Sequence, residues 1–259
     1  MWTMRPLEQD LSIFEKLELE REPVGIKYEF FKPEGFEKLD KTLALCEMVK
    51  EAQQREKPFY ITADNEDCAG KWALGMRVAP VWGEAGIIGD KMGIFQEARA
   101  NMNCITHYKN FKHGVVNYVV FSKLSQLTFE PDLLVFVGRA DQAEIILRAN
   151  AYSTGEMYES KATPIFQCSW LYTYPYLTKK LNYVMTGLGF GMKAREVYPQ
   201  GLAIVSVPWN LIPTIAQNMK EMQFVLPAWK LGREAWIKEE SAILAKVHKT
   251  TQDAGLLKE

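Results

Sequence analysis

The stretch Pro131-Asp132-Leu133-Leu134-Val135-Phe136-Val137-Gly138 is a nearly continuous apolar run that ends at a glycine. A short run of this kind is typical of a β-strand buried on both faces, and we expect a parallel-type strand here. A helical pattern follows at residues 143–151. The run at 115–121 is the strongest strand signal in the chain, because branched and aromatic residues dominate it. Strands interleaved with helices predict a layered fold.

The rest of the chain continues the same alternation of patterns. Period-two or apolar runs predict further strands, and recurrent apolar residues at helical spacing predict helices. Glycines between residues 78 and 93 predict an irregular loop, and the aromatic-rich segment 163–177 fits either a strand or a cavity wall. No linker composition marks a domain boundary. We therefore expect one α+β domain over residues 1–259, a mixed β-sheet with flanking helices. The further strands are expected at 24–30, 59–63 and 202–207, and the further helices at 7–17, 39–52, 72–76, 95–104, 209–222 and 229–248.

Composition limits the classes of function. The chain has 259 residues, of which 47% are hydrophobic, and its 31 basic and 32 acidic residues leave a formal net charge of −1. This balance indicates a globular protein and gives no field that would gather nucleic acid. The longest apolar stretch, 201–216, is interrupted by Pro208, Asn210 and Pro213, so no membrane helix is expected. With no export signal visible at the amino terminus, we expect a cytoplasmic location.

Four cysteines are the candidate functional residues, namely Cys46, Cys68, Cys104 and Cys168. In a protein that is not exported, scattered cysteines are expected to be reduced thiols or metal ligands. No Cys-x-x-Cys pair exists, so only tertiary folding could gather these thiols. Acidic residues beside Cys68 disfavour a free thiolate and favour a bound cation. We therefore predict a metal or iron–sulfur site formed by these cysteines, while buried, inert thiols remain equally open.

Two further features could contribute to a binding site. Gly187, Gly189 and Gly191 lie close together but lack the full nucleotide-binding spacing, so they are interpreted as allowing a close backbone approach to a cofactor or a neighbouring strand. Arg139 follows the strand at 131–138, where ligands of open α/β sheets commonly bind. It could hold a carboxylate there, or it could be a surface residue beside the N-cap of the next helix.

Several of these segments carry a family resemblance. Pro23–Lys27, Leu45-Cys46, 67–75 and Pro131–Leu133 resemble the ArCR-type family of uncharacterised prokaryotic proteins. The resemblance covers most of the chain and implies a cytoplasmic protein widespread in archaea and bacteria, without supplying an activity. Within the resemblance, the family's cysteines match Cys46, Cys68 and Cys168, and a fourth stands where this chain has Gly189. It therefore leaves the fourth ligand position to Cys104, to solvent or substrate, or to another side chain.

Three hypotheses of function follow. The first and favoured one is a metal- or iron–sulfur-binding protein with a redox or accessory role and a redox or subunit protein partner. The second is a cofactor-free enzyme or small-molecule-binding protein whose pocket contains Arg139, with Cys68 as a nucleophile. The third is a non-catalytic accessory subunit that docks through surfaces near Trp209, Trp229 and Trp236. Exposed aromatic residues near the carboxyl terminus also suggest homo-oligomer formation.

Overall fold

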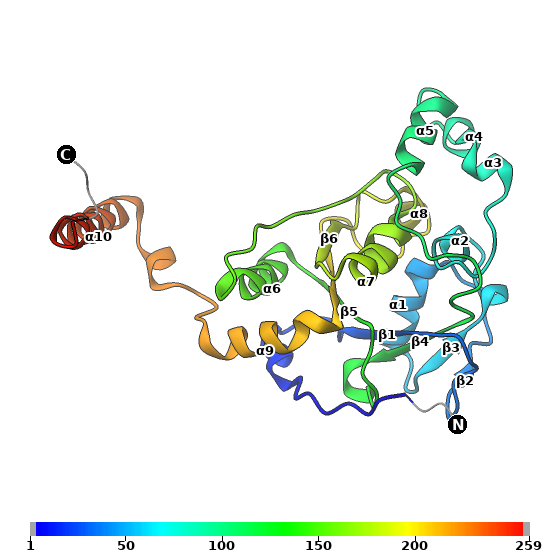
Figure 1. The fold of residues 1–259 in the computed structure, drawn as a ribbon, viewed down its shortest axis with the longest axis horizontal. Helices are drawn as coiled ribbons and strands as arrows, with labels where there is room; N and C mark the ends of the chain where they lie inside the picture. The colour runs from blue at the N-terminus through cyan, green and yellow to red at the C-terminus, as the bar shows by residue number, and fades with distance from the viewer. Residues whose placement is uncertain (1–3, 256–259) are drawn as a thin grey trace. The chain divides into compact units, whose positions relative to one another are not determined.

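The computed structural model describes residues 4–255, and its central feature is a seven-stranded mixed sheet (Figure 1). The strand order is β2-β3-β4-β1-β5-β7-β6. Only the edge strand β2 and its neighbour β3 are parallel, and every other neighbouring pair within this sheet is antiparallel. The strands are β1 (Val24–Glu29), β2 (Glu37–Lys38), β3 (Phe59–Ile61), β4 (Tyr118–Lys123), β5 (Leu133–Gly138), β6 (Asn182–Met185) and β7 (Ala203–Pro208).

The chain divides into two compact units, residues 1–220 and 221–259. The whole sheet lies in the first unit, and the second contains α10. The α+β fold class with a mixed sheet and flanking helices is therefore confirmed. The helices are α1 (Leu45–Gln54), α2 (Gly70–Ala73), α3 (Val81–Glu84), α4 (Ile87–Lys91), α5 (Ala98–Ile105), α6 (Ala140–Tyr152), α7 (Tyr174–Thr178), α8 (Phe190–Ala194), α9 (Ile212–Glu221) and α10 (Arg233–Asp253).

Helices cover both faces of the sheet. On one face, Met48 and Val49 of α1 join a buried core with alternate residues of the strands, such as Val135 of β5. On the other face, Phe136 of β5 meets Phe14 of the 3₁₀-helix Ser12–Leu17, with ring centroids 5.1 Å apart. Helix α6 also packs against β5 and β7. Because side chains of a strand alternate between faces, both sets of β5 residues are buried.

This arrangement confirms one expectation for β5 and corrects another. The strand is buried on both faces as expected. It is not parallel, since it runs antiparallel to β1, where Val24 lies opposite Val135, and to β7, where Leu134 lies opposite Val207. An apolar run reports burial and not strand direction, and here helices bury both faces of an antiparallel sheet. The inference that a ligand binds where β5 ends therefore loses its basis.

Other elements of the structure differ locally from those expected from the sequence. The helix expected at 7–17 is only the 3₁₀-helix Ser12–Leu17, and the irregular loop at 78–93 contains the short helices α3 and α4. The aromatic segment forms the π-helix Ser169–Thr173 followed by α7, so it is a helical wall and not a strand. Within residues 4–255, no helix is long and apolar enough to cross a membrane.

Candidate functional site

Three of the four cysteines line one small cavity in the first unit. Cys46 is in the first turn of α1, Cys68 is in the turn before α2, and Cys168 directly precedes the π-helix Ser169–Thr173. The cavity has a volume of about 60 Å³ for solvent-sized atoms, which is room for a few atoms of that size. Its other lining residues are Ala44, Ala69, Ile165, Phe166, Gln167, Leu171, Tyr172, Gly189, Phe190, Gly191, Met192 and Arg195.

The buried carboxylate of Glu66 holds two of the cysteine segments together. One oxygen accepts hydrogen bonds from the backbone N–H groups of Leu45 (3.1 Å) and Gly70 (3.2 Å), and the other accepts from those of Cys68 (3.0 Å) and Lys71 (3.1 Å). Amides at helix starts have no partner within their own helix, so a carboxylate can satisfy several at once. Because one acceptor joins the start of α1 to the start of α2, it brings Cys46 close to Cys68.

Gly70 is required at this junction for steric reasons. A Cβ atom at Gly70 would lie 2.6 Å from the Cβ of Leu45 and 2.7 Å from Oε1 of Glu66. Both neighbours are fixed, one by the start of α1 and the other by its four hydrogen bonds. A side chain at this position would therefore push α1 away from the Cys68 turn. This contact explains the glycine two positions after Cys68.

Arg195 joins the two cysteine segments to α8 from the other side of the cavity. Its guanidinium lies 3.5 Å from Glu47 of α1 and 3.4 Å from Asp67, which precedes Cys68. The side chain is about one-third exposed, at 34%. Arg195 was not anticipated from the sequence, because it lies more than a hundred positions along the chain from both carboxylates that it contacts. No local pattern signals its position beside the thiols.

The glycine cluster contributes to the same cavity in part. Gly189 and Gly191 both line it, at the start of α8. Gly187 is not among the lining residues, and a Cβ there would approach Gln200 at 3.6 Å. A Cβ at Gly189 would lie 2.7 Å from Cγ of Gln167, so the glycine allows this close approach. The close approach at Gly189 is therefore to the side chain of Gln167 and not to a neighbouring strand, and an approach to a cofactor stays a prediction.

Two candidate residues lie elsewhere. Arg139 is exposed at the N-cap of α6, and its guanidinium makes two hydrogen bonds of 3.1 Å to the carboxylate of Asp141. Cys104 is buried in α5, where its sulfur lies 3.6 Å from the hydroxyl of Tyr108. Neither residue lines the cavity of the three thiols. The structure therefore brings together Cys46, Cys68 and Cys168, without Cys104 or Arg139.

Burial keeps the three thiols protonated. Removal from water raises the pKa of Cys46 from its ordinary 9.0 to about 12. Burial also raises the pKa of Cys68 and of Cys168, and the nearby charge of Glu66 raises both further. The pKa of Glu66 is itself raised by burial, against the opposing effect of its backbone hydrogen bonds. Free thiolates are therefore disfavoured at neutral pH unless a cation binds next to them.

The described part of the chain contains no preassembled metal site. Among residues 4–255, no group of three or more histidine, cysteine, aspartate or glutamate side chains is arranged so that it could hold a metal ion. The three thiols share a cavity, but their side chains are not arranged as the ligands of one metal ion. Coordination would require their side chains to turn about χ1, and a cysteine side chain has three staggered rotamers for this torsion.

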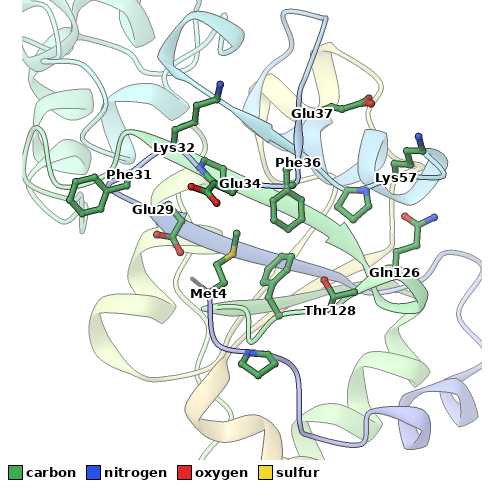
Figure 2. A pocket seen from close by; sticks show the side chains of 15 residues that line it. Met4, Glu29, Phe31, Lys32, Glu34, Phe36, Glu37, Lys57, Gln126 and Thr128 are labelled. Atoms are coloured by element: carbon green, nitrogen blue, oxygen red, sulfur yellow. The ribbon is translucent and has the colours of Figure 1, made fainter. Parts of the chain in front are cut away.

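A larger cavity lies elsewhere in the first unit (Figure 2). Its volume is about 710 Å³, and Phe36 packs there against Phe129, with ring centroids 5.6 Å apart. Figure 2 shows Lys32 and Lys57 on opposite sides of Phe36, and acidic residues including Glu34 also line the cavity. None of the candidate residues from the sequence lines it. Its charges are of both signs, so it indicates a specific ligand less clearly than the thiol cavity does.

The fold and the cavity together define an α+β protein with three thiols gathered from distant segments. The chain belongs to the family described as uncharacterised ArCR proteins, which matches residues 12–218. An uncharacterized protein from Methanocaldococcus jannaschii is 24% identical over 209 residues, which cover 79% of this chain and 89% of that protein. No solved structure matches. The resemblance seen in the sequence is therefore confirmed, and the family match ends before α10.

Proposed function

We propose that this protein binds an iron–sulfur cluster or a thiophilic metal ion through Cys46, Cys68 and Cys168. The observation that carries the proposal is the shared cavity, because three residues far apart in sequence line one small space. Thiolates are the preferred ligands of iron–sulfur clusters and common ligands of zinc. The alternative of inert thiols rests on Cys46 and Cys168, which also pack against the hydrophobic core.

The electrostatics of the cavity disfavour a reactive thiolate. The raised pKa of Cys46, about 12, means that this thiol is almost fully protonated at neutral pH. A metal ion lowers the pKa of a thiol that it coordinates, so binding releases the thiol protons to solvent. Burial raises the pKa of Cys46 and of Cys68, so both thiols are weak nucleophiles without a cation. The alternative of a cofactor-free enzyme with Cys68 as nucleophile is therefore less well supported.

The proposed centre has three cysteine ligands in this chain. Cys104 does not line the cavity, and Gly189 stands where the family resemblance implies a fourth cysteine. Three thiolates leave one coordination position for a different ligand, which distinguishes the centre from a closed four-cysteine site. A redox or accessory role in the cytoplasm, with a redox or subunit protein partner, is the function that we propose for such a centre.

The test is the composition of the protein purified without oxygen. Iron, acid-labile sulfide and zinc are quantified per chain, together with the absorption spectrum, for the natural protein and for Cys68→Ser and Cys104→Ser. We expect stoichiometric metal in the natural protein and in Cys104→Ser, which is the matched control because Cys104 lies outside the cavity. Cys68→Ser should lose most of the metal while remaining folded. Metal-free natural protein that also fails to take up iron with sulfide, or zinc, would sink the proposal.

A further inference from the structure

Helix α10 lies near the carboxyl-terminal end of the described chain (Figure 1), and one of its sides is apolar. None of its 21 residues is buried. With about 3.6 residues per turn, five apolar residues fall on the same side of the helix and form the α10 stripe, namely Trp236, Ile237, Ile243, Leu244 and Val247. The four aliphatic side chains of the stripe expose between 42% and 59% of their surface. Helices in proteins gain most of their stability from packing such a side against another surface, so we expect the α10 stripe to be covered.

The overall charge of α10 disfavours a membrane surface as the partner of the stripe. The helix carries four basic and four acidic side chains, so its polar side has no excess of positive charge. Helices that lie on anionic membranes are rich in lysine and arginine on the polar side, because these residues contact the lipid headgroups. A protein surface with an apolar stripe and charges of both signs matches α10 better.

The two halves of α10 have opposite net charge. Residues 233–242 contain three acidic and two basic side chains, whereas residues 243–253 contain two basic and one acidic side chain. In an antiparallel pair of α10 helices, each half lies beside the opposite half of the other copy. In a parallel pair, each half would lie beside a half of like charge. Charge complementarity therefore favours a second copy of α10 in the antiparallel orientation.

Glu239 and Lys246 define the alignment of such a pair. They are seven residues apart, so they lie on the same side of the helix, and both flank the α10 stripe. Corresponding flanks face each other in an antiparallel pair, so Glu239 of each copy can lie beside Lys246 of the other. The centre of this alignment falls between Ala242 and Ile243, near the middle of the stripe. The alignment that pairs the charges therefore also covers the two stripes along most of their length.

We propose that α10 is a self-association surface, on which two copies of this chain pair their α10 stripes in antiparallel orientation, with Glu239 of each copy beside Lys246 of the other. A pair of single helices buries less surface than a standard protein interface, so the dimer is weak and forms as the protein concentration rises. Twofold symmetry repeats every contact, so one substitution changes the interface at two places. The inference is independent of the proposed metal centre.

The first experiment is analytical ultracentrifugation of the full-length protein over about a hundredfold range of concentration. We expect a monomer–dimer equilibrium for the natural protein. Leu244→Glu places a charge in each stripe and should weaken the dimer by about tenfold or more. Leu188→Glu is the matched control, because Leu188 is 55% exposed in the first unit, close to the 59% of Leu244. Glu240 is the one charged residue on the stripe side between Trp236 and Val247, so Glu240→Leu should tighten the dimer.

A charge exchange tests the orientation. Glu239→Lys and Lys246→Glu should each weaken the dimer by about threefold to tenfold, because each places like charges together at two symmetric positions. The double variant should restore the natural affinity, and a mixture of the two single variants should form mixed dimers. Circular dichroism confirms that each variant remains folded. A natural protein that stays monomeric throughout, or a dimer that Leu244→Glu leaves unchanged, would overturn the proposal. A double variant as weak as the single variants would overturn the antiparallel alignment.

Discussion

Cys46 shows how strongly partial burial changes the chemistry of a residue. A thiol with an ordinary pKa of 9.0 is partly ionised at pH 8, whereas Cys46, with a pKa of about 12, has a thiolate fraction about a thousandfold lower. Since the folded state holds the proton more tightly than the unfolded state, the contribution of this thiol to the free energy of unfolding is complete below pH 9. That contribution is lost as the pH rises from 9 toward 12.

This difference predicts the pH dependence of thiol alkylation in the metal-free protein. The rate at Cys46 with iodoacetamide should rise about tenfold per pH unit from pH 7 to 10 without levelling off, because the thiolate is the reacting form. Mass spectrometry of the peptides gives the rate for each cysteine separately. The urea-unfolded chain is the control, and there the rate should level off above pH 9. Levelling below pH 9 in the folded protein would show that Cys46 is not desolvated.

At the scale of elements, the junction of α1 and α2 depends on one carboxylate. Glu66 is 1% exposed, and its four backbone hydrogen bonds tie the first turns of both helices to the Cys68 turn. Helix α2 could not be placed this way by an apolar face of its own, because it has only four residues. The position of the cavity is therefore set by a polar contact between two helix starts, while the core beneath α1 supplies most of the burial.

We expect Glu66→Gln to lower the free energy of unfolding by about 2–4 kcal/mol. An amide NH₂ would replace one carboxylate oxygen, and two backbone N–H groups would then face a donor in a buried position. Urea denaturation followed by circular dichroism measures the change. Asp64→Asn is the control, since the ion pair of Asp64 with Arg77 is exposed and should contribute less than about 1 kcal/mol. Equal stability of Glu66→Gln and the natural protein would contradict this role.

At the scale of the whole molecule, the described chain consists of two units with different character. The first contains the sheet, its core and the thiol cavity. In the second, α10 has no buried residue along its 21 positions, and Ile237, Leu244 and Val247 are exposed. The family match covers residues 12–218 and so lies within the first unit. Folding and metal binding are therefore both expected to belong to the first unit.

A chain that ends after residue 224 tests this division. We expect its melting temperature to stay within about 4 °C of the full-length value, which corresponds to about 1 kcal/mol for a protein of this size. Metal content should be unchanged. Thermal melts by circular dichroism and metal analysis give both results, and light scattering of the two chains reports whether homo-oligomer formation depends on residues 225–259. An unfolded or aggregated truncated chain would show that the first unit is not self-sufficient.

The sequence determined the fold class and most strands, because buried strand positions are occupied by apolar residue types that a sequence shows directly. The runs at 24–30, 59–63, 131–138 and 202–207 all became strands of the sheet, with ends shifted by a few residues. Residue type does not indicate strand direction, and the prediction that β5 is a parallel-type strand was wrong. The short strand β6 was not anticipated, because its four residues carry no long apolar run.

For the site, the sequence by itself identified the candidate thiols and the glycines, since these residue types carry recognisable chemistry. Only the tertiary structure decided which of them meet. It brought Cys46, Cys68 and Cys168 to one cavity, left Cys104 apart, and added Arg195 and Gln167. The physical reason is that proximity across more than a hundred residues depends on how the elements pack. Side chains that meet only through such packing have no periodicity or spacing that a single sequence could display.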